Sequence, residues 1–78
     1  MVKSSEIHEH MEVLGSDGEH VGTVDHMDGG DRIKLTKNDP KAGGKHHFIK
    51  LEWVDHVDMQ VHLKQSSADA MKQWQAAA

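Results

Sequence analysis

Short apolar segments recur along this chain, and turn-forming residues separate them every eight to twelve positions. In segments 32–36 and 57–63, apolar and polar residues alternate with the two-residue period of a strand that buries one face. Gly15 and Gly18 bracket one tight turn, and a second turn has the sequence Asp-Gly-Gly-Asp at 28–31. This pattern predicts a small β-barrel or β-sandwich.

The strand expected at 20–27 breaks the two-residue period, because Val21 and Val24 are three positions apart. Gly22 lies between them, and glycine within a strand often marks a bulge that would return both valines to one interior. The remaining strands are expected at 11–14, 32–36, 46–50 and 57–63, the last interrupted by a turn near 58–60. Helical turns are expected at 4–9 and 51–54, where Trp53 packs into one end of the barrel.

The C-terminal segment has helical features. Ser66 and Ser67 are suitable N-cap residues, and Met71 and Trp74 lie three positions apart on one helix face. We predict one domain over 1–78, with a barrel at about 3–65 and a short α-helix at about 67–76. So short a helix needs a surface to rest on, so Met71 and Trp74 either close their own barrel or form an interaction surface for another chain.

The 78 residues carry a net charge of −4, and this charge is unevenly distributed. Residues 1–31 sum to −7, residues 32–50 to +5, and residues 51–78 to −2. The two oppositely charged parts either neutralise each other or present a basic patch to an acidic partner such as RNA. The candidate basic patch comprises Arg32, Lys34, Lys37, Lys41, Lys45 and Lys50.

The order of these motifs resembles a bacterial family of unknown function with a PRC-barrel-like fold, DUF2171. The similarity covers roughly residues 3–75, and it rests on the segments 11–18, 21–24, 33–35, 48–54 and 61–63. The resemblance implies a six-stranded antiparallel β-barrel, related to barrel domains of the photosynthetic reaction centre H subunit and of a ribosome maturation factor, where the barrel acts as an adaptor. Met59 departs from the family pattern, in which a glycine turn is more typical.

Eight histidines are the least ordinary feature of the composition. Imidazole binds zinc, copper and nickel, and His8 and His10 would share one strand face, while His46 and His47 border a loop. No histidine pair has the i, i+4 spacing of a helix, and no cysteine accompanies them. We therefore expect solvent-exposed histidines and no metal site, with a histidine-based metal-binding protein as the remaining alternative.

Neither a nucleophile elbow nor a phosphate-binding glycine loop is present in the sequence. A chain of this length also leaves little room for an enclosed active-site cleft. We expect no enzyme activity and no cofactor, but a protein-interaction or adaptor module, alternatively one that binds nucleic acid. The absence of cysteine, of a signal segment and of a long apolar run favours a cytoplasmic protein without membrane insertion. A homodimer is a further expectation, because association would stabilise so small a core.

Overall fold

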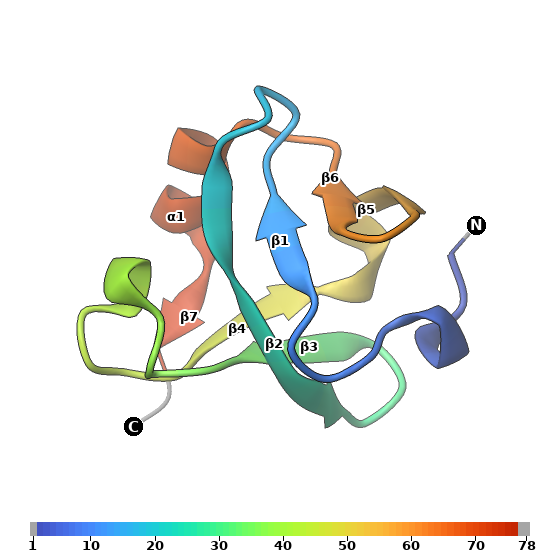
Figure 1. Ribbon diagram of the computed structural model, residues 1–78, viewed down its shortest axis with the longest axis horizontal. Helices are drawn as coiled ribbons and strands as arrows, with labels where there is room; N and C mark the ends of the chain where they lie inside the picture. The colour runs from blue at the N-terminus through green and yellow to red at the C-terminus, as the bar shows by residue number, and fades with distance from the viewer. Residues whose placement is uncertain (1, 77–78) are drawn as a thin grey trace.

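The computed structural model describes residues 2–76 as a curled β-sheet with one short α-helix near its C-terminal end (Figure 1). The strands are β1 (Glu12–Leu14), β2 (His20–Asp28), β3 (Arg32–Leu35), β4 (His47–Lys50), β5 (Val54–Val57), β6 (Val61–Leu63) and β7 (Gln75–Ala76). The helix is α1 (Ser67–Gln73), and three 3-10 turns are η1 (Ser4–Glu6), η2 (Pro40–Ala42) and η3 (Leu51–Trp53). The mostly-β class, the helical turns near 4–9 and 51–54, and the turn at 58–60 are all confirmed.

The sheet has seven strands in the order β5-β6-β1-β2-β3-β4-β7. Neighbouring strands run antiparallel except β1 and β6, which are parallel, with Val13 opposite Val61. The expected six antiparallel strands are therefore wrong in number and in direction. Within residues 2–76, no strand pairing joins β5 to β7, so hydrogen bonds do not close the curled sheet into a cylinder.

Strand β2 has two irregularities in its pairing, one opposite β1 and one between Val24 and His26 opposite β3. Val13 pairs with Gly22 while Leu14 pairs with His20, which leaves Val21 as an extra residue. Val21 and Val24 are both at most 1% exposed, so the predicted bulge and its effect on the two valines are confirmed. The first half of the strand, up to Thr23, pairs with β1, and the second half, from Val24, pairs with β3 (Figure 1).

The concave face of the sheet encloses the hydrophobic core. Its largest fully buried side chains come from β1, β2, β3, β4 and β6, and they are Val13, Val21, Val24, Ile33, Leu35, Ile49, Val61 and Leu63. Trp53 is half-buried and packs against this cluster, as expected for a residue at one end of the sheet. Met59 is 88% exposed in the turn between β5 and β6.

Helix α1 begins after Ser66, whose Oγ accepts a hydrogen bond from the backbone N–H of Asp69 at 3.2 Å. It ends at Gln73, three residues before the expected end at 76, because the backbone turns extended at Trp74 and continues into β7. Ala70 is fully buried where the helix meets the sheet. Among residues 2–76, no helix is both long and apolar enough to cross a membrane.

Candidate functional site

The structure separates the six residues of the basic patch into two groups. Arg32 and Lys50 are cross-strand partners, and Lys34 lies opposite Phe48 on the same β3–β4 pair. Lys37, Lys41 and Lys45 lie exposed in the 36–46 loop, at the other end of these strands. The six residues are therefore distributed over the β3–β4 pair and the loop that connects its strands.

Acidic neighbours engage two of the strand cations. The Arg32 guanidinium forms an ion pair with Asp28 and lies over the Phe48 ring, 4.4 Å from its centroid. Lys50 Nζ lies 3.9 Å from Glu52 Oε1. The first contact joins the basic middle of the chain to its acidic N-terminal part, and the second joins it to the segment 51–78.

The two residues of the candidate interaction surface on α1 face their own sheet. Met71 and Trp74 are half-buried and pack against the hydrophobic core. The Trp74 ring stacks on the His47 ring with centroids 3.9 Å apart and planes inclined by 15°. In the structure, the C-terminal segment thus rests on its own domain.

His47 itself corrects an expectation, since only exposed histidines were predicted. It is 7% exposed, and its Nδ1 is buried without a hydrogen-bond partner among the described residues. Burial, and then the positive charge of Lys45, lowers the pKa of His47 below its usual value of 6.5. His47 points inward because alternation along β4 puts it on the same face as Ile49, a core residue two positions later.

A polar network links β1, β2 and the N-cap of η2. His20 lies between two carboxylates, with Nδ1 2.8 Å from Glu12 Oε2 and Nε2 2.6 Å from Asp39 Oδ2. Asp39 also accepts hydrogen bonds from Thr23 Oγ1 at 2.7 Å and from the backbone N–H of Lys41 at 2.8 Å. Only 2% of the Asp39 side chain is exposed, so this carboxylate is buried and hydrogen-bonded through both oxygens.

The network favours the charged forms of both its central groups. Burial alone would lower the pKa of His20, but hydrogen bonds to Glu12 and Asp39 and their charges raise it above 6.5. Burial alone would raise the pKa of Asp39, but hydrogen bonds from Thr23, Lys41 N–H and His20 hold it below 3.8. Both ring nitrogens of His20 lie within hydrogen-bond distance of a carboxylate, and one of these belongs to the N-cap of η2, so the network fastens the 36–46 loop to the sheet.

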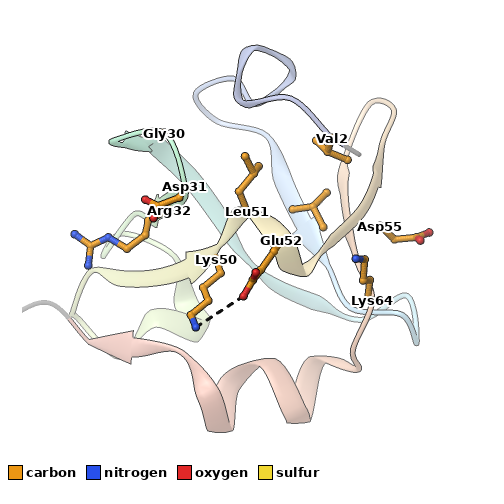
Figure 2. A pocket seen from close by; sticks show the side chains of 10 residues that line it. Val2, Gly30, Asp31, Arg32, Lys50, Leu51, Glu52, Asp55 and Lys64 are labelled. Atoms are coloured by element: carbon orange, nitrogen blue, oxygen red, sulfur yellow. Dashed lines mark ion pairs between the residues drawn. The ribbon is translucent and has the colours of Figure 1, made fainter.

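A groove of about 630 Å³ lies between the β2–β3 turn and the β5–β6 hairpin, with η3 between them (Figure 2). Val2, Leu51 and Val54 supply its apolar surface. Charged groups of both signs border it, and they are Asp31, Arg32, Lys50, Glu52, Asp55 and Lys64. An apolar hollow with a few charged groups around it is typical of a binding site.

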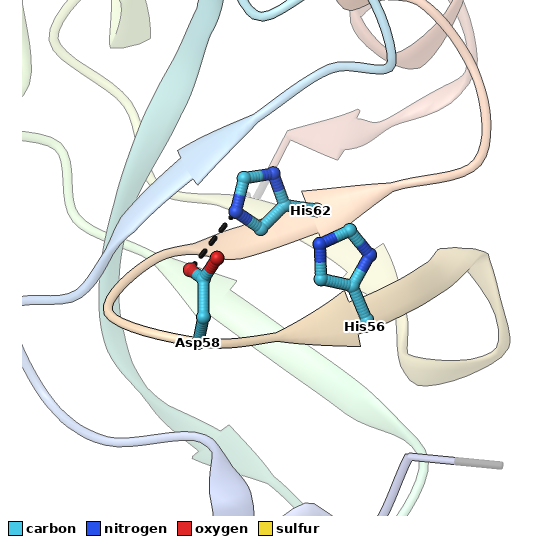
Figure 3. Close-up of side chains that lie close together, drawn as sticks. All are labelled: His56, Asp58 and His62. Atoms are coloured by element: carbon cyan, nitrogen blue, oxygen red, sulfur yellow. Dashed lines mark hydrogen bonds and ion pairs between the residues drawn. The ribbon is translucent and has the colours of Figure 1, made fainter.

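Three side chains that can bind a metal ion meet on the β5–β6 hairpin (Figure 3). His56 and His62 are cross-strand partners whose rings stack with centroids 4.3 Å apart and planes inclined by 9°. His62 Nε2 lies 2.9 Å from Asp58 Oδ1. Hydrogen bonds from the Gln60 backbone N–H and from His62 lower the pKa of Asp58 below 3.8.

Sequence reasoning missed this cluster because it compared histidines only by helical spacing, along one strand or as adjacent residues, and not across a hairpin. The predicted turn at 58–60 contained the necessary signal, since it makes residues 56 and 62 neighbours across a hairpin. No comparable signal pointed to the network of His20 and Asp39. These residues come from different elements, and only the path of the 36–46 loop brings them together.

A family model described as uncharacterized proteins conserved in bacteria, DUF2171, matches residues 7–71. No curated protein gives a significant match to the chain. The matched region contains the His20 network and the β5–β6 hairpin with its two histidines.

Proposed function

Because this chain belongs to the bacterial DUF2171 family, whose description gives no activity, we propose from the geometry that it is a non-catalytic interaction module. Its ligand is an extended segment of a partner protein, bound in the groove of Figure 2. The observation that carries this proposal is the combination of an apolar groove surface, formed by Val2, Leu51 and Val54, with a border of both charge signs. Apolar side chains of a peptide would bind that surface, and the border would select its flanking charges.

The edge of the sheet supports an extended ligand. Strand β5 is the first strand in the sheet order, and β6 is its one partner among residues 2–76. Val54 and Asp55 of β5 also line the groove. A peptide segment could therefore add its backbone hydrogen bonds to a strand edge while its side chains occupy the groove, which is the β-augmentation mode of recognition.

We also propose that the domain is related to PRC-barrel domains and that it is cytoplasmic. The curled seven-stranded sheet supports kinship with PRC-barrel domains, in which a barrel contacts other macromolecules. The cysteine-free sequence supports a cytoplasmic location. A second copy of the chain is the competing occupant of the groove, and it would make the protein a homodimer.

Nucleic acid is the second candidate ligand, and one observation favours it. Arg32, Lys34 and Phe48 share the outer face of β3 and β4, which joins positive charge to an aromatic ring. Against this reading, Arg32 is already paired with Asp28 and stacked on Phe48. A protein segment therefore remains the proposed ligand.

The test selects binding peptides from a random displayed library and maps them by amide chemical-shift changes. We expect peptides with apolar anchors to shift residues of the groove and of β5. Leu51→Ala and Lys64→Glu should weaken binding about tenfold, because each removes a contact worth roughly 1.4 kcal/mol. Lys37→Glu is the matched control, since it changes an exposed lysine in the 36–46 loop, outside the groove.

Three results would count against a peptide groove. Selected peptides could shift only the outer face of β3 and β4, or the library could yield no binder. Light scattering could instead show a dimer that Lys64→Glu dissociates, which would assign the groove to a second copy. Retardation of single-stranded RNA at low salt, lost on Lys34→Glu, would favour the nucleic-acid alternative.

A further inference from the structure

The β5–β6 hairpin places two imidazoles and a carboxylate within reach of one ion. One ligand atom from each of His56, Asp58 and His62 lies within 4.8 Å of the others. Strand pairing fixes the two histidine backbones opposite each other, and the turn fixes Asp58 through its hydrogen bond from Gln60 N–H at 2.8 Å. Figure 3 shows all three side chains on the same side of the hairpin.

We propose that His56, Asp58 and His62 form a binding site for a divalent transition-metal ion. Two imidazole nitrogens with one carboxylate oxygen suit zinc, nickel, copper(II) or iron(II). Magnesium and calcium prefer sets made wholly of oxygen, and copper(I) prefers sulfur. The side-chain types therefore narrow the ion to this class.

Small ring movements convert the cluster into a coordination sphere. Bonds of 2.0–2.2 Å in tetrahedral geometry place ligand atoms about 3.3 Å apart, so the most distant atoms must approach by roughly 1.5 Å. His62 Nε2 and Asp58 Oδ1 are already 2.9 Å apart. The His56 side chain is 57% exposed, so it can rotate without disturbing the core.

Asp55 supplies an orienting contact of the kind that metal-binding histidines use. Its Oδ2 lies 2.8 Å from His56 Nδ1, which directs the opposite nitrogen of the ring, Nε2, away from this carboxylate. Carboxylates bound to the non-coordinating nitrogen fix the tautomer of a histidine ligand and increase its basicity. His56 is thereby prepared to coordinate through Nε2.

The site has space for a further ligand. His56 and His62 line a surface hollow of about 370 Å³ together with Gly15, Ser16 and Gly18 of the β1–β2 turn. Three protein ligands leave at least one coordination position of the ion for water or a small anion. The hollow can accommodate such a molecule beside the two rings.

The experiment titrates zinc into the chelator-treated full chain, by calorimetry and by NMR of the histidine side chains. We expect one ion per chain with a dissociation constant in the micromolar range or tighter, and chemical-shift changes at His56 and His62. His62→Ala and His56→Ala should each weaken binding more than tenfold, and Asp55→Asn about tenfold. Magnesium should produce no shift.

His26→Ala is the matched control for incidental imidazole binding. His26 is an exposed strand histidine whose Nδ1 lies 3.5 Å from the carboxylate of the preceding residue, Asp25, which resembles the pair of His56 and Asp55. Asp58→Asn keeps the oxygen that accepts Gln60 N–H, so it tests the ligand charge without opening the turn. It should weaken zinc binding while circular dichroism and the melting temperature of the metal-free protein stay unchanged.

The proposal is overturned if zinc up to millimolar concentration leaves His56 and His62 unshifted. It is also overturned if His26→Ala weakens binding as much as His62→Ala does, because the ion would then bind any exposed histidine. An affinity lost only on removal of His8 and His10 would place the ion at the N-terminal segment and exclude the hairpin. None of these results depends on the peptide groove.

Discussion

His20 Nε2 and Asp39 Oδ2 are 2.6 Å apart although 19 positions separate the residues in the chain. The contact joins β2 to the N-cap of η2 and so determines where the 36–46 loop lies on the sheet. A buried carboxylate is costly unless it is paired, and here both its oxygens are hydrogen-bonded. The stability of the domain should therefore depend on the charge states of both residues.

Replacing His20 with glutamine should destabilise the fold most in mildly acidic solution. The folded-state pKa of His20 is raised, so its contribution is complete below 6.5 and is lost as the pH rises through that raised value. The folded-state pKa of Asp39 is lowered, so its contribution is complete above 3.8 and is lost in stronger acid. Urea unfolding should show a loss of about 1–2 kcal/mol near pH 5.5 and a smaller loss near pH 9. An equal loss at both pH values would contradict the charged pair.

Thr23→Val should leave the Asp39 carboxylate short of a donor. The Thr23 hydroxyl donates to Asp39 Oδ2 at 2.7 Å and lowers the pKa of that carboxyl. Removing it should cost about 1–2 kcal/mol at neutral pH and shift acid unfolding to higher pH. Thr23→Ser keeps the hydroxyl and should behave like the wild type in both measurements. Acid unfolding at the same pH in both variants would show that the hydroxyl has no such role.

Local features of the fold were predictable from the sequence where one residue type was required at one position. The bulge of β2 was predictable because Val21 and Val24 both need the interior and Gly22 allows the backbone to bend. A Cβ at Gly22 would lie 3.0 Å from Leu35 Cδ1, so a larger residue there would require the Leu35 side chain to shift. The buried positions of β3 and β6 were predictable in the same way, from the alternation of apolar and polar residues.

Features that depend on long-range pairing were not predictable. The parallel contact of β1 with β6 joins Val13 to Val61, and no local pattern records it. Strand β7 consists of Gln75 and Ala76, which lack apolar alternation and pair with β4 through their backbones. The candidate metal ligands lie between these two cases. The turn at 58–60 was predicted, but His56 and His62, on either side of it, were not compared as hairpin partners.

Gly15→Ala should destabilise the domain by disrupting the contact of the β1–β2 turn with α1. A Cβ on Gly15 would lie 2.3 Å from the backbone nitrogen of Ser67 and 2.9 Å from the carbonyl carbon of Ser66. Backbone atoms must move to relieve this overlap, so we expect a loss of about 3 kcal/mol, at the upper end for overpacking. Thermal unfolding measures the change.

Gly30→Ala is the matched control, because a Cβ there meets no atom within 4 Å, and it should be neutral or slightly stabilising. Equal melting temperatures for the two variants would refute this account.

Trp74→Ala should raise the pKa of His47 toward 6.5, because the Trp74 ring covers the imidazole at 3.9 Å and excludes water from it.

In the wild type, the folded-state pKa of His47 is lowered, so its contribution to stability is complete above 6.5 and declines as the pH falls. The variant should lose roughly 2 kcal/mol at neutral pH, less than a fully buried tryptophan would cost, because Trp74 is half-buried. Part of that difference should disappear in acid. There the wild type must either fold with a deprotonated His47 or give up the contact between the two rings, so it loses stability too. NMR titration of the His47 ring gives the pKa directly, and Met71→Ala, which removes another contact with the core but keeps the stacked Trp74 ring, is the control. If the pKa of His47 is the same in wild type and Trp74→Ala, the tryptophan does not shield the imidazole from water.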